Sequence, residues 1–441
     1  MNHATRGFHE ANTVTAVAAA PNGEIFDLEG YAAVGMAGNR LQVLTPDDTI
    51  DMPHGSELML LPDRHPIVFN FDTLDFEVLT RNPFEPGEPI LAVGAFNSPG
   101  HVNRLSCAYD DSSASSLLPL FSYGAAGFLD QGFRSAAICV DKEPRQDLRQ
   151  MPLHRVKNGV DQMRNKYPSN RLIRHIEHCA LSYGCPAGKN FFLKRYEAPL
   201  PTAQACNARC LGCISLQPDP VLSACQNRID FTPSPGEIAE LALEHITRVK
   251  HAVVSFGQGC EGDPLTAFDV IEPAVRQIRD TTDKGSVNMN TNASMPDKIE
   301  RLCRSGLDAI RVSMNSTQES HYTAYFRPRS YSFQDVLASI DRARTGDAFV
   351  AVNYLNCPGF TDTEDEFNAL HRLIKTHDIN MIQWRNLNYD PKAYLKKMEQ
   401  VQPLSAPLGM GTIIERLKKD FPDLIHGYFN PPKERYRKAG L

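Results

Sequence analysis

"HAVVSFGQGCEGDPLTAFDVIEPAVRQIRDTTDKGSVNMNTN", residues 251–292, joins two strand-like runs through a helix-like stretch. The first run, HAVVSFG, is apolar and β-branched, and the last, GSVNMNTN, alternates apolar with polar residues. Between them, PLTAFDVIEPAVRQIRD carries apolar residues at helical spacing. A strand, a helix and a second strand in this order predict a βαβ unit with parallel strands.

The same alternation continues on both sides of this unit. Upstream, FFLKRYEA (191–198) is predicted to be a strand, and a helix follows in which Ser234 is the N-cap, Pro235 is N1 and Glu237 completes a capping box. Further strands are predicted at 308–315, 349–357 and 379–388, with helices at 296–306, 332–344 and 363–375. Six strands alternating with helices predict an α/β fold, a partial (β/α)6 TIM-type barrel.

The rest of the chain suggests three more regions. Residues 1–150 hold short apolar runs separated by Pro, Gly, Asn and Asp, which is typical of a β-rich domain. We therefore expect a β-rich N-terminal domain (1–150), a mixed, partly helical connector (151–190), the partial barrel (191–390) and a C-terminal extension (391–441) with one helix.

Composition narrows the functional class. The chain has 441 residues, a net charge of −6 and 22% charged residues, so nucleic acid and anionic membranes are not indicated as partners. The polar start MNHATRGFHEANTV lacks a signal-peptide core, and no run approaches the ~18 apolar residues of a membrane span. We expect a cytoplasmic protein whose 11 cysteines are reduced; their odd number argues against a disulfide framework.

Polar residues recur at every second position of the predicted strands. They are Asn288, Asn290 and Asn292 in one strand, Arg311, Ser313 and Asn315 in the next, and Gln383 and Arg385 in the last. Such strands have one apolar face for the helices and one polar face. An antiparallel sheet with a wet face would show the same alternation, but the intervening helices argue against it. Because a dry polar lumen is costly, the barrel is predicted to hold a polar ligand.

A cluster of three cysteines follows the first predicted strand. In QACNARCLGCISL (204–216), Cys206, Cys210 and Cys213 are spaced C-x3-C-x2-C. Inert buried thiols would not need this spacing, and structural zinc would need a remote fourth ligand, such as Cys185. A [4Fe–4S] cluster bound by three thiolates leaves one iron open for a small chelating molecule. This third interpretation explains the missing ligand.

The C-x3-C-x2-C motif at the end of a first barrel strand resembles that of the radical S-adenosylmethionine (SAM) superfamily. The resemblance implies that the three cysteines hold the cluster and that the amino and carboxylate groups of SAM occupy the open iron. It implies an enzyme in which reductive cleavage of SAM gives a 5′-deoxyadenosyl radical that abstracts a substrate hydrogen. A reducing partner such as flavodoxin or ferredoxin is implied as well.

Two further elements resemble SAM-binding motifs of that family. GQGCEGDPL (257–265) resembles the glycine-rich G-E-P element, which aligns Gly262, Asp263 and Pro264, with Glu261 as a second acidic candidate. NTNAS (290–294) resembles the T-N-G end of the third strand, which implies SAM contacts from Asn290 and Asn292.

A third element concerns the ribose and carboxylate of SAM. RVSMNS (311–316) resembles the V-S-x-D element, so Ser313 and Asn315 are implied contacts, and Arg327, with Arg329 next, is implied to pair with the SAM carboxylate. Gly212 departs from the family, because the residue before the third cysteine is usually aromatic and packs near adenine. Adenine contacts are therefore expected from elsewhere.

The substrate is expected on the side of strands five and six. By alternation, Asn353, Gln383 and Arg385 point into this space, and a confined arginine requires an anionic partner. The partner is either a protein carboxylate or the substrate, so we expect a polar or anionic substrate, and catalytic residues are not assigned. A noncatalytic iron–sulfur or zinc module that uses the barrel as a scaffold is the alternative.

Other cysteines and histidines have no assigned role. Cys260 lies in the glycine-rich element, where a passive small residue is favoured over a ligand. Cys179 and Cys185 would supply part of an auxiliary cluster, but two cysteines are too few alone. For His175 and His178, which flank Cys179 at helical spacing, a solvated or core role is favoured over metal binding.

Overall fold

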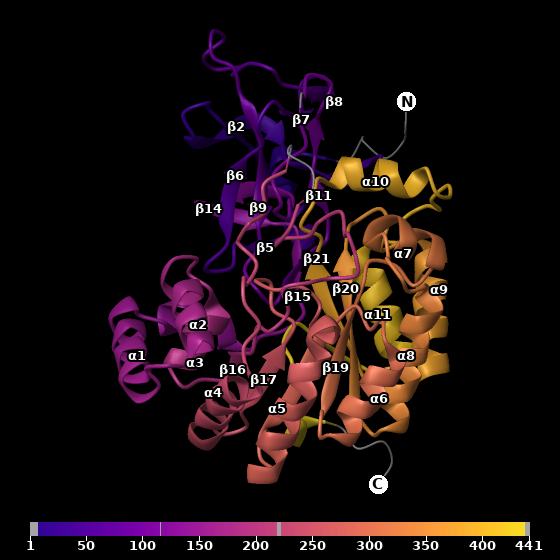
Figure 1. The fold of residues 1–441 in the computed structure, drawn as a ribbon. Helices are drawn as coiled ribbons and strands as arrows, with labels where there is room; N and C mark the ends of the chain where they lie inside the picture. The colour runs from indigo at the N-terminus through magenta and orange to yellow at the C-terminus, as the bar shows by residue number, and fades with distance from the viewer. Residues whose placement is uncertain (1–7, 115, 218–221, 437–441) are drawn as a thin grey trace.

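The computed structural model describes residues 8–114, 116–217 and 222–436 (Figure 1). The first seven residues of the polar N-terminal segment lie outside them. The centre of the molecule is a parallel sheet whose strands follow each other in chain order from β16 to β22. In the described residues β16 and β22 are the two edges, so the α/β fold is confirmed as an open half-barrel.

The sheet has seven strands, one more than the six predicted. They are β16 (Glu197–Pro199), β17 (Val253–Phe256), β18 (Ser286–Thr291), β19 (Ala309–Met314), β20 (Phe349–Asn356), β21 (Met381–Asn386) and β22 (Ile425–Gly427). The predicted first strand at 191–198 is mostly wrong, because Phe191 and Phe192 end a helix and β16 contains only three residues.

Helices cover the outer, apolar face of this sheet. They are α4 (Pro235–Arg248), α5 (Phe268–Thr281), α6 (Pro296–Arg304), α7 (Glu319–Phe326), α8 (Phe333–Thr345), α9 (Glu364–His377) and α11 (Met410–Asp420). Helix α10 (Pro391–Glu399) lies above them, at the level of the N-terminal strands (Figure 1). The predicted capping box begins α4: Ser234 Oγ accepts from the Glu237 N–H at 3.2 Å, and Glu237 accepts from the Ser234 N–H at 2.8 Å. Val254, Val287 and Ile310 are fully buried beneath these helices.

The N-terminal third forms antiparallel strands that stand above the half-barrel in Figure 1. They are β1 (Thr15–Ala19), β2 (Ile25–Ala32), β3 (Val34–Ala37), β4 (Arg40–Val43), β5 (Ile50–Asp51), β6 (Glu57–Leu60), β7 (His65–Asn70), β8 (Asp75–Val78), β9 (Leu91–Phe96), β10 (His101–Asn103), β11 (Ser106–Cys107), β12 (Tyr109–Asp110), β13 (Ala126–Leu129), β14 (Gly132–Ser135) and β15 (Ala137–Cys139). A β-rich N-terminal region is therefore present, while the domain boundaries stay a prediction.

Three helices connect the two parts. They are α1 (Leu153–Lys166), α2 (Arg171–Leu181) and α3 (Pro186–Phe192), which lie beside α4 at the lower left of Figure 1. Ion pairs cross from this group to α4, including Arg171 with Glu237 at 2.7 Å. The connector thus packs against the first helix of the half-barrel.

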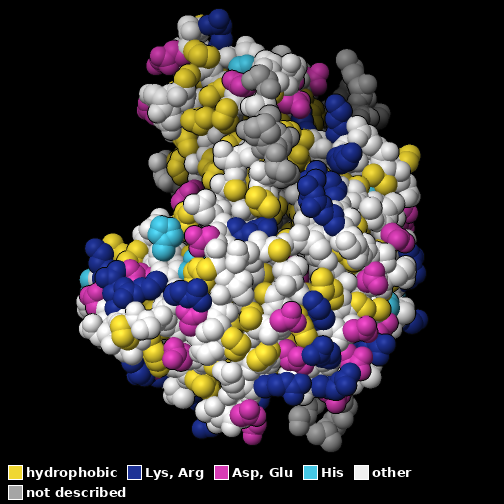
Figure 2. Space-filling model, in the orientation of Figure 1, with side chains coloured by type: hydrophobic (Ala, Val, Ile, Leu, Met, Phe, Trp, Pro, Cys, Tyr) yellow, Lys and Arg dark blue, Asp and Glu magenta, His cyan; other side chains and the backbone are white. Residues whose placement is uncertain are grey.

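The C-terminal segment does more than add one helix. It contributes α10, α11 and the seventh strand, and Asn430 follows this strand and lies buried at the floor of the half-barrel. No helix among the described residues is long and apolar enough to cross a membrane. Acidic and basic side chains are interspersed over the lower half of the face shown in Figure 2.

Candidate functional site

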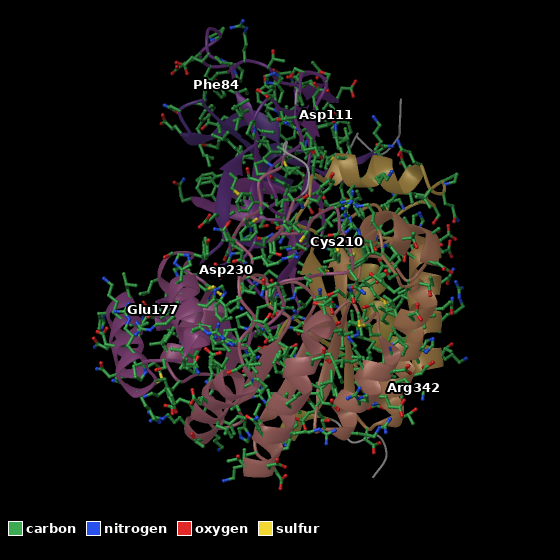
Figure 3. The ribbon with its side chains drawn as sticks, in the orientation of Figure 1. Phe84, Asp111, Glu177, Cys210, Asp230 and Arg342 are labelled. Atoms are coloured by element: carbon green, nitrogen blue, oxygen red, sulfur yellow. The ribbon has the colours of Figure 1, made fainter. Side chains whose placement is uncertain are left out.

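A cavity of about 470 Å³ opens where the half-barrel meets the N-terminal strands. Cys210, labelled near the middle of the molecule in Figure 3, lies in its wall. The cavity lies at the carboxyl ends of parallel strands, where β/α folds place their sites. It is lined by all three cysteines of the C-x3-C-x2-C motif, by the glycine-rich loop after β17, by polar residues of β18 to β21, and by Phe96, Asn97 and Ser122 of the N-terminal region.

Neighbouring segments hold the cysteine loop in place through its backbone. The N–H groups of Arg209 and Leu211 donate to the carbonyl oxygens of Phe326 and Tyr325 at 2.9 and 3.0 Å. Asn207 joins the loop to the end of β18, because its side chain donates to Ser294 Oγ and accepts from Asn292, both at 2.8 Å. The short helix α7 and strand β18 therefore position the thiols.

The three thiols are confined and electrostatically unfavourable on their own. The pKa of the Cys210 thiol is raised well above its usual value, mainly by burial and then by repulsion from the other two thiolates. The Arg228 guanidinium lies close to the trio, with Nη2 3.9 Å from Cys213 Sγ. The pKa of Cys206 is likewise raised, to about 11, chiefly by burial. A positively charged group bound between the three thiols would lower the pKa of each of them.

The spacing of the three sulfur atoms distinguishes between metal groups. They do not form a set of ligand atoms lying within 4.8 Å of one another, a property found among the described residues in a different trio, discussed below. In a [4Fe–4S] cluster each thiolate binds its own iron, so the sulfurs stand farther apart than the ligands of a single ion. At least one pair of the three sulfurs therefore lies more than 4.8 Å apart, which fits a cluster better than one zinc ion.

The glycine-rich loop is built onto the cysteine loop. The N–H groups of Gly262 and Asp263 donate to the carbonyl oxygens of Ala203 and Ala205 at 2.6 and 2.9 Å. At Gly262 a β-carbon would overlap the carbonyl oxygen of Ala205, so this close approach requires glycine. Gly262 thus joins the glycine-rich loop to the cysteine loop through its backbone, while its predicted contact with SAM stays a prediction.

Both acidic candidates of this loop bind protein backbone. Glu261 accepts from the N–H groups of Thr202, Ala203, Gly257 and Gln258 at 2.7–2.9 Å. Burial raises the pKa of Glu261 to about 7, and these donors oppose the shift. Glu261 therefore ties the end of the first strand to the glycine-rich loop.

Asp263 makes a similar link to the third strand. Its carboxylate accepts from the Leu265 N–H at 3.0 Å, the Asn292 N–H at 2.6 Å and the Thr291 hydroxyl at 2.9 Å. Burial raises its pKa to about 6, against these hydrogen bonds. Glu261 and Asp263 line the cavity, but their carboxylates mainly hold its walls together.

Most of the predicted strand residues face the cavity. Asn290, Asn292 and Ser313 line it, as the alternation predicts. Asn315 does not, and its predicted orientation is wrong: its amide nitrogen donates to the His321 carbonyl at 3.2 Å and to the Tyr394 hydroxyl at 3.1 Å. Strand β19 ends at Met314, so the two-residue period no longer applies at Asn315.

Arg327 also falls outside the cavity wall. It ends α7 in the left-handed conformation, with φ of 47°, is exposed, and donates through Nε to the Arg209 carbonyl. Its side chain fastens the cysteine loop instead of facing the cavity. Arg329, the second choice, likewise contacts the loop, with its N–H donating to the Asn207 carbonyl at 2.7 Å.

Tyr325 occupies the space that Gly212 leaves. A β-carbon on Gly212 would lie 2.9 Å from the Tyr325 hydroxyl and 2.8 Å from the Asn388 carbonyl oxygen. Tyr325 lines the cavity, so an aromatic ring is present next to the third cysteine although it comes from α7. This ring and that of Phe326, which also lines the cavity, are candidates for the missing adenine contact.

The far side of the cavity carries two arginines. Arg385 lines it as predicted, and the guanidinium stacks 3.6 Å over the Tyr428 ring and donates to the Tyr428 carbonyl at 2.7 Å. Arg311 lies beside it, and burial together with the charge of Arg385 lowers the pKa of Arg311. Within the described residues Nε of each arginine and Oδ1 of Asn353 are buried without a hydrogen-bond partner.

Gln383 lies below the cavity instead of lining it. It accepts from Arg311 Nη1 at 3.3 Å and donates to Asn430 Oδ1 at 2.9 Å. Asn430 in turn donates to Glu197 Oε1 at 2.7 Å, and Glu197 pairs with Arg145 at 3.1 Å. The C-terminal segment thus supplies hydrogen-bond partners for the polar side chains in the lower part of the lumen. The sequence interpretation had assigned these partners to water or a ligand.

Sequence reasoning missed several cavity residues. Arg228 lies in an irregular segment, where no periodicity predicts the direction of a side chain. Asn97 and Ser122 come from the N-terminal region, and no sequence motif predicts that this region packs against the half-barrel. Arg311 was recognised on the polar strand face but not as a partner of Arg385. Cys260 was left open between ligand and passive residue, and it does not line the cavity.

Comparisons with known proteins bear on this site. Residues 200–374 match the family model described as the Radical SAM superfamily. No curated protein matches.

Several solved structures resemble parts of the chain. A radical SAM methyltransferase from Sphaerobacter thermophilus is 14% identical, with a TM-score of 0.35 over 46% of this chain and 62% of that one. Streptococcus suis SuiB bound to S-adenosylmethionine is 11% identical, with a TM-score of 0.38 over 60% and 56%. The FeFe-hydrogenase maturase HydG from Carboxydothermus hydrogenoformans is 13% identical, with a TM-score of 0.33 over 59% and 69%. The chain spans less than two thirds of the length of the first two of these structures.

Proposed function

We propose, for a chain that carries a radical SAM domain at residues 200–374, that it is an enzyme which cleaves SAM reductively and abstracts hydrogen from an anionic substrate. The observation that carries the proposal is the convergence of Cys206, Cys210 and Cys213 on one wall of a polar cavity whose opposite wall presents two arginines. A metal group and an anion-binding site within one cavity are the two components that this chemistry needs.

The residues present fit a [4Fe–4S] cluster. Cys206, Cys210 and Cys213 would hold it, because all three line the cavity and at least one pair of their sulfurs lies farther apart than the ligands of a single ion. When bound, such a cluster supplies an electron to SAM, whose cleavage yields a 5′-deoxyadenosyl radical. Arg228 beside Cys213 would offset part of the negative charge of the thiolates.

The first four strands are the proposed SAM side. Gly262, Asn290, Asn292 and Ser313 line the cavity next to the cysteine loop. Tyr325 adds an aromatic surface at Gly212. For the SAM carboxylate, Arg327 and Asn315 are unsuited by their positions, and the polar groups of β18 and β19 are closer to the cavity.

The side of β20 and β21 is the proposed substrate side. In the part of the chain that the structure describes, Nε of Arg311, Nε of Arg385 and Oδ1 of Asn353 are buried without a hydrogen-bond partner. Two like charges in a confined space favour an anion between them, and an unpartnered amide oxygen favours a donor. We therefore propose a substrate that carries a carboxylate or phosphate and a hydrogen-bond donor close to it.

The decisive test is anaerobic reconstitution followed by incubation with SAM and dithionite. We expect about four irons per chain and release of 5′-deoxyadenosine and methionine, detected by mass spectrometry. Cys206→Ala, Cys210→Ala and Cys213→Ala should each abolish release, while Cys303→Ala on α6 should not. Stoichiometric zinc at these three cysteines and no cleavage product would overturn the proposal in favour of a noncatalytic module. A reducing partner such as flavodoxin or ferredoxin would replace dithionite.

A further inference from the structure

A second group of metal-binding side chains lies outside the cavity. Nε2 of His175, Sγ of Cys179 and Sγ of Cys260 all lie within 4.8 Å of one another. His175 and Cys179 are one turn apart on α2, and Cys260 comes from the glycine-rich loop after β17. Two elements distant in sequence thus bring one imidazole and two thiols together.

The distance between His175 and Cys179 matches the ligand sphere of a single ion, and Cys260 Sγ lies within 4.8 Å of both ligand atoms. Nε2 of His175 lies 3.6 Å from Cys179 Sγ. Zn–N and Zn–S bonds of about 2.0 and 2.3 Å at tetrahedral angles place ligand atoms roughly 3.5–3.8 Å apart. Sulfur atoms this close cannot each bind a separate iron of a cubane, so the trio does not fit the auxiliary cluster considered from the sequence.

The surroundings suit a structural ion. Cys179 is 4% and Cys260 is 7% exposed, so both thiols are shielded, while His175 is half-buried and packs edge-on to Phe231 at 6.2 Å. The backbone holds the trio: the Ile229 N–H donates to the Cys260 carbonyl at 2.8 Å. In Figure 3, Glu177 on the same helix lies at the left of the molecule, with Asp230 above it.

The backbone places Cys185 near the trio, but its Sγ does not belong to the group of atoms within 4.8 Å of one another, so its side chain would have to rotate to reach an ion at this site. The Cys185 N–H donates to the Cys179 carbonyl at 3.0 Å, which places Cys185 beside the trio at the start of α3. Structural zinc sites with three cysteines and one histidine are a common type.

We propose that His175, Cys179 and Cys260 bind one thiophilic divalent metal ion of the zinc type, with Cys185 as the fourth ligand. The ion would fasten α2 to the glycine-rich loop. Gly259 and Glu261, the neighbours of Cys260, line the cavity, so the site would brace a cavity wall from behind. The favoured role of Cys260 as a passive residue and of His175 as a solvated or core residue would then not hold.

Metal analysis of the full chain, purified anaerobically from zinc-supplemented cultures, tests the proposal. We expect about one zinc per chain in addition to the cluster iron. Cys179→Ser and Cys260→Ser should lose the zinc, and iron retained on the other three cysteines would show that these variants fold. The triple variant Cys206→Ala/Cys210→Ala/Cys213→Ala should lose the iron and keep the zinc, and Cys303→Ser should keep both.

Cobalt gives a second readout that does not require Cys179→Ser or Cys260→Ser to fold. Co²⁺ added to the triple variant should produce a thiolate-to-metal charge-transfer band and tetrahedral d–d bands. The bands should weaken with added Cys185→Ser and persist with added Cys225→Ser.

Three results would overturn the proposal. They are no zinc in the wild-type protein together with no cobalt bands in the triple variant, a Cys179–Cys260 disulfide mapped in the anaerobic protein, or an iron–sulfur spectrum that persists in the triple variant. The first two do not bear on SAM cleavage, and release of 5′-deoxyadenosine by the wild-type protein separates the third from it, so the two proposals fail independently.

Discussion

At Gly262, one hydrogen in place of a side chain allows two loops to touch. A methyl group there would overlap the Ala205 carbonyl, which is backbone and cannot rotate away. We predict that Gly262→Ala lowers the free energy of unfolding by about 1–3 kcal/mol, as overpacking does, and impairs cluster retention. Urea unfolding and iron analysis measure the two effects. Gly411→Ala, on α11 with open space around it, is the control and should be neutral or slightly stabilising. A fully stable Gly262→Ala with normal iron would contradict the backbone contact.

Arg385 is expected to serve the substrate and not SAM cleavage itself. It belongs to β21, on the side of the cavity away from the cysteine loop, and its Nε has no hydrogen-bond partner among the described residues. We predict that Arg385→Ala leaves uncoupled 5′-deoxyadenosine formation within about twofold of wild type and abolishes substrate turnover. Liquid chromatography with mass spectrometry measures the first rate without a known substrate. If Arg385→Ala kept its iron but lowered both the rate of SAM cleavage and the affinity for SAM, Arg385 would belong to the SAM side of the cavity.

Residue-level inference from the sequence succeeded where a regular period held. Inside strands, the alternation correctly oriented Asn290, Ser313 and Arg385. It failed for Asn315, one residue beyond β19, while Arg327, which was implied by the resemblance and not by the alternation, ends α7 in a left-handed conformation and lies outside the cavity wall. Both positions lie where a regular element ends, so local geometry and not periodicity decides the direction of the side chain.

The start of helix α4 can be predicted from its capping residues. Ser234 and Glu237 satisfy each other's backbone N–H groups, which would otherwise lack partners at the first turn. We predict that Ser234→Ala lowers the free energy of unfolding by about 1 kcal/mol. Thr281→Ala at the exposed end of α5, where the hydroxyl bonds only to its own helix, should change it by less than about 0.5 kcal/mol. Equal effects in the two variants would show that the capping box contributes nothing.

Elements were predictable in proportion to their length and amphipathicity. Helices α4, α8 and α9 and strands β18 to β21 have clear periods and were found. Strands β16 and β22 have three residues each, and α7 has eight residues with three aromatic side chains, which gives little period to read. These short elements matter for the site, since α7 holds the cysteine loop and β22 leads into the floor of the half-barrel.

At the scale of the molecule, the cavity depends on the docking of the N-terminal strands. Asn386 of β21 accepts from the Asn103 N–H at 2.7 Å and donates to the His101 carbonyl at 3.1 Å. Asn356 of β20 donates to the Asn103 carbonyl at 2.8 Å. This polar contact continues into the cavity wall, where Asn97 of the N-terminal region donates to Asn103 Oδ1 at 2.9 Å. The long sequence separation of these pairs explains why no local pattern predicted them.

A buried ion pair strengthens the same interface. Arg64 and Asp390 lie 3.2 Å apart with side chains that are 3% and 5% exposed. Asp390 also accepts from the Tyr109 hydroxyl at 3.0 Å and the Leu118 N–H at 3.3 Å, and it caps α10 through the N–H groups of Lys392 and Ala393. One carboxylate therefore joins three segments of the N-terminal region to the half-barrel side.

Removing that carboxylate should uncouple the two parts. We predict that Asp390→Ala lowers the free energy of unfolding by about 3–5 kcal/mol, because Arg64 is left as a buried unpaired charge. Trp384, the single tryptophan, lies fully buried in β21 and reports on the half-barrel by fluorescence, while far-ultraviolet circular dichroism reports on the whole chain. In urea the two signals should change together in the wild-type protein and separate in Asp390→Ala, with the N-terminal strands released first.

Asp111→Ala is the matched control, because it removes a half-exposed ion pair with Lys392 across the same interface and should cost less than about 1 kcal/mol. If Asp390→Ala unfolded in one step at the wild-type midpoint, the polar cluster around Asp390 would not be what fixes the N-terminal region over the cavity.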